Sequence, residues 1–231
     1  MLDQAFEALK TYDWGMDPSV LQPIDEAIVA TQGDAAARNS LESRLVAALQ
    51  TDCPQAAKDA VCRALRTIGT AAAVPALAAL LADEKLSHMA RYALQCIPAP
   101  EAEKALLEAL PKVAGKLKIG VVSSLGACGD ATAVAILQPM LADSDSAIAR
   151  AAAYALGEIG SLAAHQALTA ATAHPSTKDA IADSLLKCAE ILLASGKKSE
   201  AKSAYEKCLS GNPSKAVKIA ADRGIAACDR A

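Results

Sequence analysis

The chain has 231 residues, of which 53% are hydrophobic but only 3% aromatic, and its formal net charge is −3. This negative balance argues against nucleic-acid binding, because that affinity comes mainly from cations that neutralise phosphates. No run of eighteen apolar residues is present, so the sequence predicts no membrane insertion. Alanine, the best helix former, accounts for 56 residues and strand patterns are missing, so we expect an all-α protein.

The N-terminal segment carries clear helix start signals. A short amphipathic helix is expected over residues 2–10. After a loop, Asp17 and Pro18 supply an N-cap and a proline at the first helical position, which predicts a helix through about Thr31. Gly33 and Asp34 end this helix and begin the next one, which is expected to end near residue 50.

A leucine then recurs about every thirty residues, and this period is the main evidence for the architecture. The leucines are spaced by 29, 31 and 31 residues, at Leu65, Leu94, Leu125 and Leu156. Around them we expect helices over residues 54–68, 71–82, 85–97, 100–112, 116–128, 131–142, 145–159 and 162–173. Short connections make neighbouring helices antiparallel. The sequence therefore predicts a right-handed α-solenoid of stacked antiparallel helix pairs.

Two repeat families resemble parts of the chain. Residues 146–160 contain an arginine, an alanine run and an A-L-G-x-I-G ending. This segment resembles the short bacterial HEAT repeat of the PBS-lyase HEAT-like type, and residues 54–176 resemble such repeats throughout. Residues 182–215 are similar to a tetratricopeptide repeat, with four residues at that family's spacing: Gly196, Ala201, Tyr205 and Pro213.

These resemblances imply three parts. They are an N-terminal helical cap (1–53), HEAT-like repeats (54–176), and a tetratricopeptide-like hairpin with a capping helix (177–231). A HEAT pattern specifies a fold and says almost nothing about chemistry.

The cysteines and histidines do not form a recognisable metal site. Seven cysteines occur, without C-x-x-C or zinc-ligand spacing. We expect reduced, mostly buried thiols and a cytoplasmic location. Disulfide pairing among Cys188, Cys208 and Cys228 stays open. An extracytoplasmic location is the alternative if the chain is an excised domain. No carboxylate or cysteine cluster accompanies any histidine, so no metal and no other cofactor is expected at His88, His165 or His174.

Motifs for nucleophilic, metal-dependent or nucleotide-dependent catalysis are missing from the sequence. We therefore expect a non-catalytic scaffold that binds a partner protein or peptide on a concave face. The HEAT resemblance leaves two alternatives open. One is an accessory domain of a larger enzyme, for example a sugar-active one, and the other is a chromophore lyase or chaperone.

Two surfaces are candidates for binding. In the helix that carries each period leucine, the residue two positions earlier points away from the core, and the residue six positions earlier shares that face. The first column contains Arg63, Tyr92, Ser123 and Tyr154, and the second contains Asp59, His88, Ile119 and Arg150. From these columns we expect a binding stripe made of Arg63, His88, Tyr92, Arg150 and Tyr154. Tyrosine and arginine often anchor interfaces. The alternative is that these are ordinary exposed helix positions.

The second candidate surface is the N-terminal loop. Tyr12 and Trp14, near Phe6, are among the few aromatic residues of the chain. They either cap the open end of the solenoid or form a hydrophobic docking patch.

Overall fold

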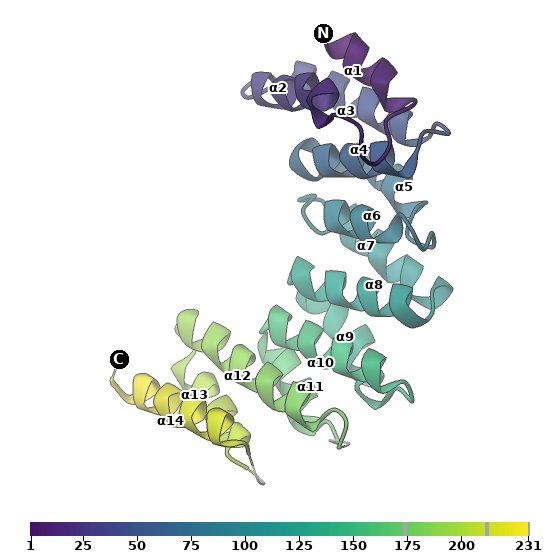
Figure 1. The fold of residues 1–231 in the computed structure, drawn as a ribbon. Coiled ribbons are helices and arrows are strands. Elements are labelled where there is room, and N and C mark those ends of the chain that lie inside the picture. The colour runs from purple at the N-terminus through teal and green to yellow at the C-terminus, as the bar shows by residue number, and fades with distance from the viewer. Residues whose placement is uncertain (173–174, 211–212, 231) are drawn as a thin grey trace. The chain divides into compact units, whose positions relative to one another are not determined.

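The computed structural model describes residues 1–172, 175–210 and 213–230, and every regular element in those ranges is a helix (Figure 1). The prediction of an all-α protein is confirmed. The chain divides into two compact units, Met1–Val121 and Val122–Ala231. This boundary falls inside the predicted HEAT-like segment, and the division into cap, HEAT-like and tetratricopeptide-like parts stays a prediction.

The first unit begins with the helices that its start signals predict. Its opening elements are α1 (Leu2–Leu9), the 3-10 helix η1 (Pro18–Leu21), α2 (Gln22–Ala30) and α3 (Ala35–Leu49). Asp17 accepts a hydrogen bond from the Ser19 amide at 2.9 Å, and Asp34 accepts one from the Ala37 amide at 2.9 Å. Each carboxylate therefore satisfies a backbone donor that a helix start leaves without a partner.

The repeats of the first unit follow in two layers. They comprise α4 (Gln55–Ile68), η2 (Ala71–Ala73), α5 (Val74–Ala78), α6 (Ser87–Leu94), α7 (Pro100–Ala109), η3 (Leu110–Lys112) and the first half of α8 (Gly115–Cys128). One layer contains α2, α4 and α6, in which α4 contacts both neighbours, and the other contains α3, η2 with α5, and α7 (Figure 1). The groove discussed below lies on the first of these layers.

Some helices are shorter than the sequence predicts. Helices are expected to end at residues 82 and 97, but the α-helical hydrogen bonding of α5 and α6 stops earlier, at Ala78 and Leu94. Their last turns continue with bonds to the third preceding residue, for example from the Leu81 amide to Ala78 and from the Ile97 amide to Leu94. This tighter 3-10 geometry is common where a helix ends in a short connection.

The second unit contains the other half of α8 and the remaining helices. These are η4 (Ala131–Ala133), α9 (Val134–Leu137), η5 (Gln138–Ala142), α10 (Ser146–Ile159), α11 (Leu162–Ala170), α12 (Lys178–Ala194), α13 (Lys198–Cys208) and α14 (Lys215–Arg230). α10 packs on α12, and α13 packs on both α12 and α14. A Cβ atom added at Gly126 would overlap Ala155, and one at Gly224 would overlap the Tyr205 ring. Glycine at these two places allows neighbouring helices to approach closely.

The period leucines are buried in both units. Leu65 and Leu94 in the first unit, and Leu125 and Leu156 in the second, are each 0% exposed. They occupy equivalent places on α4, α6, α8 and α10. The thirty-residue period therefore identifies residues that are fully buried in each unit.

The structure also gives the state of the cysteines. All seven are free thiols, of which Cys96 is exposed, Cys128 is half-buried and the other five are buried. Burial raises the pKa of Cys62, Cys188 and Cys208 to about 12. These three thiols are therefore protonated and behave as small hydrophobic side chains.

Candidate functional site

The structure places the predicted stripe residues on two helices of the first unit and on one helix of the second. In the first unit, Arg63 on α4 and His88 on α6 are exposed, and Tyr92 on α6 is half-buried. In the second unit, both predicted residues lie on α10: Arg150 is half-buried and its guanidinium lies 3.4 Å from the Ser146 hydroxyl, while Tyr154 is 49% exposed. The exposed or partly exposed character expected of all five is therefore observed.

One further member of the predicted face is buried. The Asp59 side chain is only 7% exposed, and its Oδ1 atom has no hydrogen-bond partner. Burial raises the pKa of Asp59, and the nearby positive charges of Arg63 and His88 oppose that shift. The expectation that Asp59 faces solvent is wrong. A position six residues before the period leucine lies on the flank of the helix, about 120° from that leucine, and at Asp59 this flank is close enough to α6 for the charge of His88 to act on the carboxylate.

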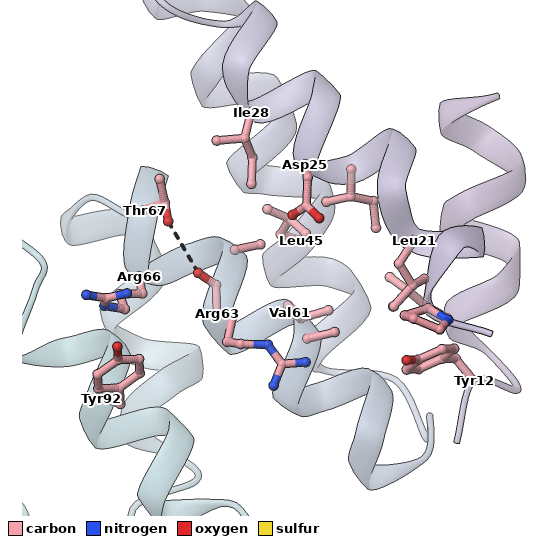
Figure 2. Close-up of a pocket in the computed structure, with 15 residues that line it drawn as sticks. Tyr12, Leu21, Asp25, Ile28, Leu45, Val61, Arg63, Arg66, Thr67 and Tyr92 are labelled. Carbon is pink, nitrogen blue, oxygen red and sulfur yellow. Dashed lines mark hydrogen bonds between the residues drawn. The ribbon is translucent and has the colours of Figure 1, made fainter. Parts of the chain in front are cut away.

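A groove in the first unit joins parts of both predicted surfaces. It has a volume of about 430 Å³ and opens between α2, α4, α6 and the segment that follows α1 (Figure 2). Tyr12 of the N-terminal patch and Arg63 and Tyr92 of the stripe all line it. Its complete lining is Leu9, Tyr12, Pro18, Leu21, Ile24, Asp25, Ile28, Leu45, Ala60, Val61, Arg63, Ala64, Arg66, Thr67 and Tyr92.

The floor of the groove is apolar. Leu21 and Ile24 come from η1 and α2, Leu45 comes from α3, and Val61 comes from α4; each of them is at most 9% exposed. These side chains lie on the buried faces of the helices that surround the groove. An aliphatic or aromatic group that entered the groove would meet a surface already largely removed from water.

The rim of the groove is polar and partly preorganised. The Arg66 guanidinium lies over the Tyr92 ring, 4.3 Å from its centroid, and its Nε donates a hydrogen bond to Cys96 Sγ at 3.4 Å. This hydrogen bond is the main cause that raises the pKa of Arg66. Figure 2 shows Arg66 and Tyr92 at one end of the groove, Tyr12 at the other, and Arg63 between them.

One of the two residues of the N-terminal patch lines the groove, and the role of the patch as cap or docking surface stays a prediction. Tyr12 is half-buried and lines the groove, whereas Trp14 is 63% exposed and is not among the lining residues. The Arg44 guanidinium covers Phe6 at 4.1 Å and pairs with Asp3 at 2.7 Å. Phe6 and Tyr12 therefore pack against the end of the unit, while Trp14 is an exposed aromatic beside it.

Sequence reasoning missed Arg66 and Asp25. Arg66 lies one helical turn after Arg63, and residues three apart on a helix are neighbours; that spacing was visible in the sequence but outside the two columns considered. Asp25 lies on α2, which precedes the repeats, so the thirty-residue period could not relate it to α4.

The structure adds two observations on metals and membranes. Within residues 1–172, 175–210 and 213–230 there is no group of three or more His, Cys, Asp or Glu that could hold a metal ion. His88 is exposed and His165 is buried, and His174 lies outside the described residues. None of the helices described here has the length and apolar character that crossing a membrane requires.

Comparison with known proteins agrees with the repeat architecture. The family model for HEAT repeats matches residues 102–186, and the model for the PBS lyase HEAT-like repeat matches residues 59–83. Both matches support the prediction of a short HEAT-repeat protein. Neither match covers α13 and α14, so the tetratricopeptide-like hairpin stays a prediction. No curated protein matches the chain.

Among solved structures, 23 chains match. One is human deoxyhypusine hydroxylase, solved in complex with glycerol. It has 17% sequence identity and a TM-score of 0.37, and the similarity covers 100% of this chain and 96% of that one.

Proposed function

We propose that this HEAT-repeat scaffold is a non-catalytic protein that binds a partner protein or peptide in the groove between α2, α4 and α6. One observation carries the proposal. Two surfaces that the sequence singles out separately contribute Tyr12, Arg63 and Tyr92 to a single groove with an apolar floor. Its volume of about 430 Å³ falls in the range that accommodates a small ligand or a few side chains of a peptide.

The chemistry of the lining favours binding over catalysis. Tyrosine and arginine are the residue types most enriched at the energetic centres of interfaces. The lining contains Asp25 and Thr67, but Thr67 donates its hydroxyl to the Arg63 carbonyl at 3.5 Å. A hydroxyl nucleophile needs an adjacent base that removes its proton, and the Thr67 contact is to a carbonyl oxygen instead.

The cellular location is part of the same proposal. Seven free thiols, five of them buried, support a reducing compartment such as the cytoplasm.

The test uses peptides selected from a random dodecapeptide display library on the whole chain. Binding of a fluorescein-labelled selected peptide is measured by fluorescence anisotropy. Tyr12→Ala and Tyr92→Ala should each weaken binding by about tenfold or more, since truncation of an interface anchor typically costs 1–4 kcal/mol. Tyr154→Ala, the same change on α10, is the matched control and should leave binding unchanged.

Circular dichroism of each variant verifies that the helices are retained. The proposal is overturned if no peptide is selected, or if both folded groove variants bind as tightly as the wild type.

A further inference from the structure

The α4 side of the groove carries two arginines in adjacent turns. Arg63 and Arg66 are both exposed and both line the groove. Neither guanidinium forms an ion pair in the part of the chain that the structure describes. Residues three apart on a helix lie on neighbouring turns of one face, so the two charges are presented to the same ligand.

Arg66 is held in a geometry that leaves donors available. Its guanidinium is stacked over the face of Tyr92 and uses only Nε for the hydrogen bond to Cys96. A stacked guanidinium keeps its terminal N–H groups in the plane of the group, where they can form paired hydrogen bonds to a carboxylate. The stacking also reduces the conformational freedom that Arg66 would lose on binding.

Resting on the proposed function, we propose that the groove recognises a short acidic peptide segment in which a carboxylate lies next to an aliphatic side chain. The carboxylate would accept hydrogen bonds from Arg63 and Arg66. The aliphatic side chain would enter the groove between α2 and α4 and contact Ile24 and Val61. Recognition of acidic motifs by arginine clusters is a recurrent mode of peptide binding.

The surroundings favour a short motif over a long acidic tract. Residues 1–121 contain 15 acidic and 12 basic residues, so the two arginines form a local positive spot on a negatively charged unit. Asp25 on the opposite wall and Asp59 next to Arg63 add negative charge close by. A polyacidic ligand would be repelled by these groups, whereas one or two carboxylates at Arg63 and Arg66 gain attraction at short range.

Asp25 can contribute to orientation. Figure 2 shows its carboxylate on the α2 side of the groove, across from the α4 arginines. A carboxylate accepts hydrogen bonds only, so a backbone N–H of the bound segment is the group that it would bind. The ligand would then lie with its carboxylate toward α4 and its backbone toward α2.

The experiment compares peptide composition with arginine dependence. Dodecapeptides selected on the whole wild-type chain should be enriched in Asp or Glu adjacent to Leu, Ile or Val. For the tightest peptide, replacing its acidic residues with the corresponding amides should weaken binding by about tenfold or more. Arg63→Gln and Arg66→Gln should each give a similar loss. Arg223→Gln, at an exposed arginine on α14 that belongs to neither candidate surface, is a matched control and should have no effect.

A further variant separates charge from packing. Asp59 does not line the groove but lies close enough to Arg63 to influence it. Asp59→Asn removes a negative charge beside the proposed carboxylate site, and it should tighten binding of the acidic peptide by a few fold. The amide-substituted peptide should bind Asp59→Asn and wild type equally.

The outcomes distinguish this inference from the proposed function. If selected peptides lose binding in Tyr92→Ala but lack acidic residues and bind Arg63→Gln and Arg66→Gln as well as wild type, the groove binds peptides and the acidic specificity is wrong. If no peptide depends on any groove residue, both proposals are wrong. Enriched acidic peptides with both arginine variants impaired and Arg223→Gln unaffected support both.

Discussion

Replacing Asp59 with alanine should stabilise the protein, which is unusual for a buried position. The Asp59 Oδ1 atom is buried without a partner, and such an orphaned group costs roughly 1–3 kcal/mol. Alanine is also a better helix former than aspartate in the middle of α4, by up to about 0.7 kcal/mol. Against these gains stands the lost attraction to Arg63 and His88, about 1 kcal/mol or less for partly exposed partners. The net expectation is a free energy of unfolding higher by about 1–2 kcal/mol.

The same substitution at Asp34 provides a control with the opposite sign. Asp34 caps α3 through the Ala37 amide, and loss of such a cap costs about 1 kcal/mol. Urea unfolding followed by circular dichroism at pH 7 should therefore move the midpoint up for Asp59→Ala and down for Asp34→Ala. If Asp59→Ala lowers the midpoint as Asp34→Ala does, the Asp59 carboxylate is favourably bonded and the reasoning is refuted.

The pH dependence of the Asp59 effect has a definite sign. Because burial raises the pKa of Asp59 above 3.8, the folded protein holds this proton more tightly than the unfolded chain does. The stability that protonated Asp59 contributes to the folded protein is therefore present below pH 3.8, and it is lost as the pH rises through the pKa of Asp59 in the folded state. The advantage of Asp59→Ala over wild type should be largest at neutral pH and should shrink as the solution is acidified toward pH 4.

Three further predictions follow from buried groups. Leu94→Ala should lower the free energy of unfolding by about 2–5 kcal/mol, because Leu94 is fully buried; a loss below about 1 kcal/mol in urea unfolding would contradict its place in the core. Burial lowers the pKa of His165 below 6.5, so the unfolded chain takes up this proton first as the pH falls. Stability should then decrease below pH 6.5 by up to about 1.4 kcal/mol per pH unit until the folded pKa is reached, and the same urea series on His165→Gln should lack this part of the slope. With a thiol-specific chromogenic disulfide, native protein should show fast reaction at Cys96, slower reaction at Cys128 and protection of the other five until urea is added; seven equally fast thiols would contradict the burial.

Much of the fold could be predicted because its signals are local. Asp17 and Asp34 mark helix starts through their own side chains, and the thirty-residue period marks the leucines that become fully buried. Gly160 ends α10 with a φ of 59°, the left-handed geometry that its place after a helix predicts. Gly69 also follows a helix but has a φ of −60°. A side chain at Gly69 would instead collide with the Leu65 carbonyl and the Ile97 side chain.

The groove could be predicted only in part because it depends on tertiary packing. The sequence identified Tyr12, Arg63 and Tyr92 but placed them on two separate surfaces. Their meeting requires η1 and α2 to pack across α4, and these helices lie outside the repeat period. Which partner binds the scaffold is equally beyond the repeat pattern, since that pattern reports how helices stack and not which ligand they contact.

Methyl NMR of the protein, labelled at isoleucine, leucine and valine, tests the central claim most directly when a display-selected peptide is added. The account predicts that the shifted signals belong to residues that line the groove, above all Ile24, Ile28 and Val61, and that Leu162 and Ile219 in the second unit do not move. Shifts confined to the second unit, with the three groove signals unchanged at saturating peptide, would contradict it.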